Sequence, residues 1–297
     1  MKLKIALEWF INPDHLPFIA GIENGTYKQA GLDVELITPT EHYDGFEELK
    51  TGKIDLHCNE PLHLFEHYFD GLKSLGCFFE TRGGVMIRAN SVDKLKANQK
   101  IKITTPASNP ITNKIGYEIL KRYAQKNNFV IDKENVEFVQ TDFWHIFNMK
   151  NDESFDGAWL CFYNFEGIEA KIEGFDNLFI DHIISPYPNF SALELMTTQD
   201  IIDEKGEAIC KFIHLTNELA NYLQNNPIEA MNMYYEYTKE QKSDLMDAII
   251  EDTIPRLKSN IKADAQKWAE LYSFLENLEL VKLSDDEYKS IWEIPKH

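Results

Sequence analysis

The chain of 297 residues has little positive charge. It contains 30 lysine and arginine residues against 49 aspartate and glutamate residues, for a formal net charge of -19. Such a field repels phosphate backbones and anionic lipid surfaces, so we expect neither nucleic acid nor a membrane surface as a partner. The sequence also lacks an apolar run close to the roughly 20 residues that a spanning helix needs, which argues against membrane insertion. A small ligand in a shielded pocket remains compatible with this charge.

Cysteine is also scarce, and its spacing is uninformative. The four cysteines (Cys58, Cys77, Cys161 and Cys210) are scattered and form no C-x-x-C pair. Metal and redox motifs use short paired spacings, so we interpret these residues as buried or idle thiols. Their scatter fits a reducing compartment.

The N-terminus lacks the apolar core of 7 to 15 residues that defines a signal peptide. Residues 1–9, MKLKIALEW, instead enter a strand-like segment at once. We therefore expect a cytoplasmic protein if the sequence is complete as given. If a signal sequence was removed, the expected location is the periplasm or the cell surface, and a transporter permease becomes the expected partner.

Strand-like and helix-like segments alternate twice along the chain. The first 70 residues follow a β-α-β-α-β-α order, and a second β-α-β set begins near residue 91. Such alternation predicts α/β lobes with parallel sheets. From Asp200 onward the pattern is helical only. We predict a discontinuous lobe one over residues 1–88 and 192–297, including bracing C-terminal helices, and a lobe two over residues 89–191.

The stretch Leu7–Pro17 concentrates polar groups between a strand and a helix. It contains Glu8, Trp9, Asn12 and His15 within a few residues. The carboxyl end of a strand in an open α/β sheet is a common place for a small ligand. Trp9 offers a face for stacking a flat heteroaromatic ring, and the other three offer hydrogen-bonding groups. The alternatives are a core or lid tryptophan and a structurally packed histidine.

The segment His57–His67 gathers further titratable side chains. Asn59, Glu60 and His63 are candidate ligand contacts at the start of a helix. His63 and His67 have the i, i+4 spacing of zinc ligands. The segment lacks the ordered His-Glu-x-x-His arrangement and shows no obvious third ligand, so we expect no metal. A plain structural or surface role is the other alternative.

A loop rich in small polar residues precedes a helix in the second half of the chain. Ser108, Asn109 and Thr112 lie where backbone N–H groups of a helix start could hold an anion or a hydroxyl. Two prolines in this loop lack an N–H, which weakens a phosphate site. A capped, solvent-exposed loop is the alternative.

Four more residues complete the predicted ligand contacts. Trp159, Tyr163 and Glu166 lie at a strand end and the following helix start, and Tyr187 precedes a late strand. A second aromatic ring there would enclose a planar ligand together with Trp9. Core packing of Trp159 and helix capping by Glu166 are the alternatives.

Several motifs resemble one known family. They are Leu7-Glu8-Trp9 with His15, residues 25–34 (GTYKQAGLDV), residues 52–55 (GKID), residues 156–159 (DGAW), residues 162–168 (FYNFEGI), and Asn226-Pro227 with Ala230 and Tyr234. Over roughly residues 3–237 the chain resembles the thiamine-pyrimidine branch of the type-2 periplasmic-binding-protein fold. That branch includes pyrimidine-precursor binding proteins of ABC transporters and the fungal thiamine-pyrimidine synthase.

The resemblance implies a two-lobed α/β clamshell that closes by a hinge on a ligand in the inter-lobe cleft. The ligand expected from it is a thiamine-type pyrimidine precursor. A sulfonate-like or other small molecule is a further alternative. A basic cleft would favour it, and Arg82 and Arg88 are the nearby arginines in lobe one before the crossover.

The same resemblance separates a binding protein from an enzyme. The synthase holds vitamin B6 on a lysine four residues before a histidine that is consumed. Here His63 matches that histidine, but Asn59 occupies the lysine position. Asparagine cannot form a Schiff base. The cysteine-rich iron motif is also missing, because the corresponding residues 186–191 read PYPNFS. We therefore expect reversible binding, no cofactor and no catalytic residue. Synthesis of the pyrimidine precursor in the cytoplasm, with His63 in the reaction, is the alternative.

Overall fold

The computed structural model describes residues 1–39 and 45–293, and the chain divides into two compact units. Unit 1 comprises Met1–Glu80 and Ala192–His297, and unit 2 comprises Thr81–Ser191. The sequence prediction had assigned residues 81–88 to the first lobe. They lie in unit 2 because strand β5 (Gly83–Arg88) pairs with strands β8 (Gly157–Phe162) and β9 (Asn177–Ile180).

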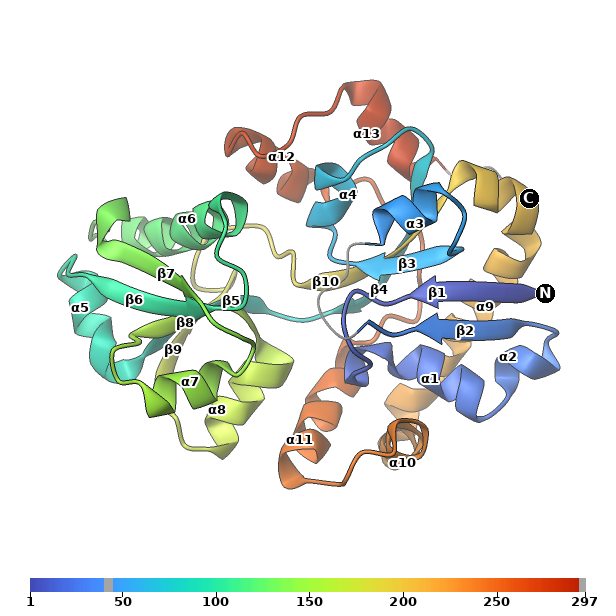
Figure 1. Cartoon of the computed structure of the whole chain (residues 1–297), viewed down its shortest axis with the longest axis horizontal. Helices are drawn as coiled ribbons and strands as arrows, with labels where there is room; N and C mark the ends of the chain where they lie inside the picture. Colours follow the sequence, from blue (N-terminus) through green and yellow to red (C-terminus); the bar gives the residue numbers. More distant parts are fainter. Residues whose placement is uncertain (40–44, 294–297) are drawn as a thin grey trace. The chain divides into compact units, whose positions relative to one another are not determined.

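Unit 1 is built on a five-stranded mixed sheet (Figure 1). Its order is β2 (Asp33–Ile37), β1 (Lys2–Ala6), β3 (Leu56–Asn59), β10 (Ala192–Thr198) and β4 (Leu72–Glu80). The first three strands are parallel, but β10 runs antiparallel to both β3 and β4. The prediction of parallel sheets was therefore incomplete. Strand β4 leads the chain out of unit 1 and β10 leads it back, so the two run in opposite directions.

Unit 2 repeats this arrangement. Its sheet has the order β7 (Val136–Gln140), β6 (Ile101–Thr105), β8, β5 and β9. Strands β7, β6 and β8 are parallel, whereas β5 is antiparallel to β8 and β9. Each sheet thus has a parallel part, whose carboxyl ends meet at one edge.

Helices connect the strands and extend the C-terminal part of unit 1. The helices before β10 are α1 (Leu16–Glu23), α2 (Thr26–Gln29), α3 (Phe46–Lys50), α4 (Leu62–Glu66), α5 (Val92–Lys96), α6 (Pro110–Lys126), α7 (His145–Asn151) and α8 (Ile168–Ile172). After β10 come α9 (Gln199–Asn225), α10 (Pro227–Thr238), α11 (Asp244–Thr253), α12 (Ala269–Asn277) and α13 (Asp285–Trp292). None of the helices in the described ranges combines the length and the apolar character needed to cross a membrane.

Aromatic side chains join the helices of unit 1 to its sheet. The ring of Phe18 on α1 lies 4.8 Å from Phe78 on β4 and 5.5 Å from Phe212 on α9. Tyr27 on α2 packs 5.1 Å from Phe212, and its buried hydroxyl forms a 2.8 Å hydrogen bond with Thr216. Burying such side chains stabilises the fold by roughly 1.5–3 kcal/mol each.

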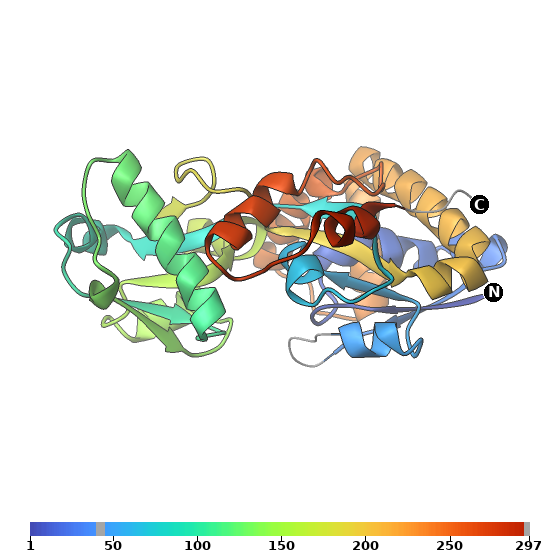
Figure 2. The same cartoon turned by 90° about the horizontal axis from the view of Figure 1, so that it is seen from above.

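The C-terminal helices brace α4. Helix α12 packs on α4 and α13 packs on β4, and Figure 2 shows these helices in red beside those elements. The Phe65 ring on α4 lies 5.3 Å from Tyr272 and 5.9 Å from Tyr288. A helix of one turn has little stability alone, so this aromatic packing holds α4 in place.

Candidate functional site

Two polar segments meet at the carboxyl end of the parallel strands of unit 1. Strands β1 and β3 are adjacent and parallel, with Ala6 opposite His57. Glu8 follows β1 and Glu60 follows β3, and the Glu8 carboxylate is close enough to act on the pKa of Glu60. We call Glu8, Trp9, Glu60 and His63 the strand-end cluster. The structure therefore brings together residues that are far apart in the sequence.

Asn12 and His15 hold Glu8 in position. The buried His15 ring places Nε2 3.2 Å from the Glu8 Oε2, and Nδ1 accepts the Asn12 N–H over 3.4 Å. The proton facing Glu8 is therefore on Nε2. Burial acts to lower the pKa of His15, but the Glu8 carboxylate beside it raises that pKa above its usual value. Asn12 is also engaged, because its Oδ1 accepts the Asp14 N–H over 2.9 Å.

Trp9 is the aromatic residue of the cluster. Its side chain is half-buried, and its ring centroid lies 5.4 Å from that of Phe10 at an interplanar angle of 58°. Phe10 is 47% exposed, an unusual position for a phenylalanine. The pair presents aromatic surface at the end of β1.

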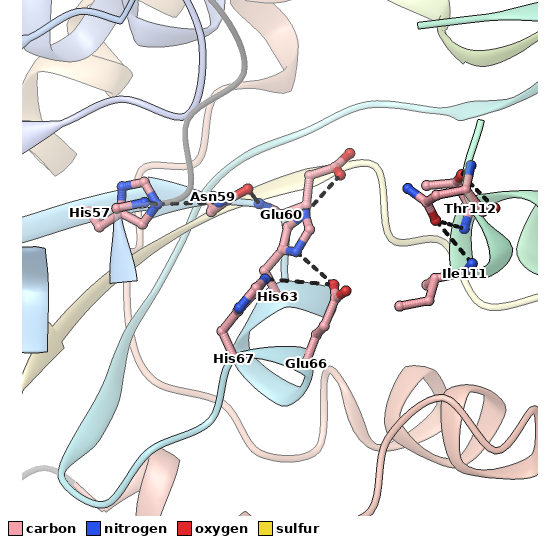
Figure 3. Close-up of polar contacts among 10 residues, drawn as sticks. His57, Asn59, Glu60, His63, Glu66, His67, Ile111 and Thr112 are labelled. Carbon is pink, nitrogen blue, oxygen red and sulfur yellow. Dashed lines mark hydrogen bonds and ion pairs between the residues drawn. The ribbon is translucent and has the colours of Figure 1, made fainter. Parts of the chain in front are cut away.

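A chain of hydrogen bonds orients the residues after β3 (Figure 3). His57 Nδ1 donates to the Ala6 carbonyl over 3.1 Å, which leaves Nε2 as an acceptor. That Nε2 accepts from the Gly45 N–H and from Asn59 Nδ2 over 3.3 and 3.2 Å. Asn59 Oδ1 in turn accepts the Glu60 N–H over 2.8 Å. Asn59 is only 1% exposed, so its placement is that of a positioning residue.

Glu60 has an unusual acid strength for a glutamate. Burial raises its pKa to about 7, although His63 acts to lower it and the carboxylates of Glu8 and Glu66 act to raise it. Near neutral pH the carboxyl group therefore exists in both forms. As a carboxylate it accepts hydrogen bonds, and as an acid it can also donate one.

His63 lies on α4, the helix that follows β3, with a carboxylate near each of its two ring nitrogens. Its Nδ1 is 2.9 Å from the Glu66 Oε2, and its Nε2 is 3.9 Å from the Glu60 Oε2. Figure 3 shows the ring bridging Glu60 and Glu66. His67 lies one turn later, and its Nε2 is 3.9 Å from the same Glu66 oxygen. The sequence contained no obvious third ligand for this histidine pair; Glu66 supplies one spatially.

The predicted anion loop of unit 2 is a capped helix start. Asn109 Oδ1 accepts the N–H groups of Ile111 and Thr112, each over 2.9 Å (Figure 3). Thr112 Oγ1 accepts the Asn109 N–H over 3.2 Å, and Ser108 Oγ donates to the Phe138 carbonyl over the same distance. The first N–H donors of α6 are thus already used, which favours the capped-loop alternative.

Trp159 and Tyr187 lie inside unit 2. Trp159 is 1% exposed, and its Nε1 donates to the Thr112 carbonyl over 3.0 Å, joining β8 to α6. The buried Tyr187 hydroxyl donates to the Gly83 carbonyl over 2.5 Å. Both placements suit core packing rather than a stacking face, because their rings are enclosed by protein.

Tyr163 begins, and Glu166 lies within, the π-helical turn Tyr163–Gly167 that follows β8. The buried Glu166 Oε2 accepts the Phe162 N–H over 2.6 Å, as expected for a capping carboxylate. The guanidinium carbon of Arg82 lies over the half-buried Tyr163 ring, 3.7 Å from its centroid. Arg82 is in turn paired with Asp181 over 2.8 Å. Ligand contact by Tyr163 stays a prediction.

The sequence did not predict the structural roles of two residues, His57 and Arg82. His57 was predicted only as a strand residue and as the first of the titratable side chains in His57–His67, yet its fully buried ring connects β1 to β3. Arg82 stood in a break between two apolar runs, and its cation–π contact joins residues far apart in the chain. A lone histidine within a buried strand was the available signal for the first, because such a ring needs partners.

Sequence comparison shows relatives over most of the chain. The profile of the family described as NMT1/THI5 like matches residues 12–230. A Haemophilus influenzae relative named as a thiamine biosynthesis protein is 22% identical over 285 residues, covering 94% of this chain and 88% of the relative. The formylaminopyrimidine-binding protein of Halalkalibacterium halodurans is 22% identical over 311 residues, covering 97% and 90% respectively.

Structural comparison gives the fold. The crystal structure of the periplasmic aliphatic sulphonate binding protein SsuA from Escherichia coli matches with a TM-score of 0.71 at 12% identity. The match covers 100% of this chain and 93% of that chain. The predicted periplasmic-binding-protein-like α/β fold is therefore confirmed.

Proposed function

Because this chain belongs to the NMT1/THI5-like family, we propose that it reversibly binds a small planar aminopyrimidine of the thiamine-precursor class. The strand-end cluster of unit 1 is the proposed contact surface. The observation that carries the proposal is the juxtaposition of Glu8 and Glu60 after two adjacent parallel strands. The names of the two relatives, one for formylaminopyrimidine binding and one for thiamine biosynthesis, agree with it.

The chemistry of an aminopyrimidine matches these side chains. Its exocyclic amine donates hydrogen bonds, and its ring nitrogens accept them. Glu8, held by His15, offers an acceptor, and Glu60 with a pKa of about 7 offers either an acceptor or a donor. Stacking on the half-buried Trp9 adds about 0.5–1.5 kcal/mol beyond the buried area.

Residue 59 favours binding over synthesis. A Schiff base with an aldehyde cofactor requires an amine, and residue 59 is an amide. Both ends of that amide are engaged, with His57 and with the Glu60 N–H. The Asn59 amide therefore has a structural role at the buried end of β3 that a lysine amine could not fill in the same way. This supports a protein that holds a ligand rather than one that forms a Schiff base.

Isothermal titration calorimetry tests the proposal directly. The panel contains 4-amino-5-hydroxymethyl-2-methylpyrimidine, its N-formylated amine analogue, thiamine, and the phosphates of these compounds. We expect one aminopyrimidine to bind with 1:1 stoichiometry and to raise the melting temperature. Binding of an alkanesulfonate in place of every pyrimidine, or no binding at all, would overturn the assignment.

Matched variants locate the contact surface. We expect Trp9→Ala and Glu60→Gln each to weaken binding by about tenfold or more, which corresponds to about 1.4 kcal/mol. Trp144→Ala and Glu47→Gln serve as controls, because both side chains are exposed and lie outside the cluster. Equal affinity of all four variants would place the ligand elsewhere.

We further propose that the loaded protein delivers its ligand to the permease of an ABC importer. The support is the likeness of fold to a protein titled as periplasmic and sulphonate-binding. Cells lacking the gene should take up labelled aminopyrimidine more slowly than complemented cells. Unchanged uptake, together with binding by the purified protein, would remove the transport role and leave the binding role.

A further inference from the structure

Three metal-ligating side chains gather around α4. They are His63, Glu66 and His67, and one ligand atom from each lies within 4.8 Å of the others. Glu66 Oε2 lies 2.9 Å from His63 Nδ1 and 3.9 Å from His67 Nε2. Figure 3 shows the two rings on the same side of the Glu66 carboxylate, with a dashed contact from His63 to it.

These separations are close to the distances between neighbouring ligand atoms around a bound transition-metal ion. Zinc bonds to nitrogen and oxygen are about 2.0–2.2 Å, so neighbouring ligand atoms in a tetrahedral site lie roughly 3.3–3.5 Å apart. The observed separations lie on both sides of that value. Small side-chain rotations would therefore give the required geometry without a movement of the helix.

The surroundings provide the support that metal-binding histidines need. Glu60 Oε2 lies 3.9 Å from His63 Nε2, on the side of the ring away from Glu66. At 3.9 Å this carboxylate is too far for a hydrogen bond, but its charge favours a proton on Nε2, which leaves the Nδ1 lone pair for a metal ion. The His67 ring stacks on Phe46 at 4.9 Å with an interplanar angle of 19°, which restrains its orientation.

Charge also favours a cation here. Glu60 and Glu66 flank His63, and Glu8 adds a third carboxylate within electrostatic range of Glu60. Neutral imidazoles with a carboxylate form a nitrogen and oxygen donor set that suits zinc and related divalent ions. All three donors remain partly accessible, with side-chain exposures of 16%, 24% and 33%, so an ion can reach them.

We propose that His63 Nδ1, Glu66 and His67 Nε2 form a binding site for a divalent transition-metal ion such as Zn²⁺. Glu60 acts as the positioning residue for His63. Three protein ligands leave a coordination position for water or for a nitrogen of a small molecule. The site does not depend on the proposed pyrimidine binding.

Metal titration without any pyrimidine tests this site. Protein stripped with EDTA is titrated with ZnCl₂ in competition with a chromophoric chelator, which suppresses weak binding to surface carboxylates. We expect one ion per chain. Titration with CoCl₂ should give the visible absorption bands of Co²⁺ in a site of low coordination number, and ZnCl₂ should abolish them.

Variants assign the ligands. We expect His67→Ala and Glu66→Gln each to weaken Zn²⁺ binding at least tenfold, and His63→Gln to do the same. His214→Ala is the matched control, because His214 and Glu218 form an exposed i, i+4 pair at 3.5 Å on α9. Circular dichroism confirms that each variant is folded, and His67→Gln replaces any alanine variant that is not.

Two results would overturn the metal site. One is the absence of binding in competition with the chelator, which leaves an adventitious ion only. The other is equal affinity in the wild type, the three ligand variants and the control. Neither result bears on the calorimetry with aminopyrimidines, so the two proposals fail separately.

Discussion

Glu194 is a carboxylic acid within the central sheet of unit 1, where it is only 1% exposed. Ser74 Oγ donates to its Oε2 over 2.7 Å, and Trp268 Nε1 donates to its other oxygen. Burial raises its pKa from 4.5 to about 7, although both donors act to lower it. The folded chain therefore holds this proton more tightly than the unfolded chain does.

That difference makes stability depend on pH. The stabilisation from a raised pKa is complete below the unfolded value and is lost as pH rises through the folded value. Glu194→Gln keeps an acceptor for Trp268 and a donor for Ser74 without the charge. We expect its advantage over wild type in urea unfolding to grow by about 2 kcal/mol between pH 5.5 and pH 8.

Glu47→Gln, an exposed substitution in the same unit, controls for the change in net charge. Its free energy of unfolding should follow the wild-type pH profile. A Glu194→Gln profile parallel to the wild type would show that the buried carboxyl does not control this dependence.

At the scale of elements, the C-terminal segment is held against β4 by a close backbone approach. A Cβ added to Gly76 would meet the Lys262 backbone at 2.3 Å, and Gly76 has a φ of 127°. Nearby, the Lys258 N–H donates to the Phe78 carbonyl over 2.8 Å. The C-terminal segment therefore packs directly against β4, the strand that carries both Gly76 and Phe78.

We expect Gly76→Ala to destabilise the protein by about 3 kcal/mol or more, because backbone atoms cannot move aside cheaply. Gly71→Ala is the matched control, since Gly71 has a φ of 90° and nothing within 4 Å of an added Cβ. Its cost should be the strain of a positive φ alone, about 1–2 kcal/mol. Equal losses in urea unfolding would mean that the contact with Lys262 contributes nothing.

The boundaries of helices and strands could be predicted from local sequence more readily than the pairing of the strands. Asn226-Pro227 separates α9 from α10, and Gly25, with a φ of 75°, lies between α1 and α2. These are effects of single residues on the backbone. The antiparallel insertion of β10 between β3 and β4 depends instead on partners more than 100 residues away.

At the scale of the molecule, we expect the net charge of -19 to lower the stability of the folded chain. Self-repulsion among surface carboxylates destabilises a compact chain, and salt screens it. Raising NaCl from 10 to 150 mM shortens the Debye length from about 30 to about 8 Å. We expect the melting temperature to rise by roughly 2 °C, which corresponds to about 1 kcal/mol.

An equal osmolarity of sorbitol separates screening from general solute effects and should give a smaller shift. A fall in melting temperature with NaCl would mean that ion pairs outweigh the repulsion. The pairs concerned would be partly buried ones such as Lys205–Asp55, at 2.7 Å.

The sequence by itself determined the α/β class, the two alternating sets and the resemblance to the thiamine-pyrimidine branch of the type-2 periplasmic-binding-protein fold. Hydrophobic periodicity and turn residues act locally, so they can be recognised without coordinates. The same holds for the amide at residue 59, because residue type alone decides whether an amine is present.

Only the tertiary structure decided which of the predicted side chains are accessible to a ligand and which are taken up by core packing or internal hydrogen bonds. It enclosed Trp159 in the core, made Asn12 and His15 supports for Glu8, and brought Glu66 close to both His63 and His67. Burial and hydrogen-bond partners come from segments that are distant in the chain. For that reason the spacing of residues can predict that a site exists, but only the packing of helices and strands determines which residues belong to it.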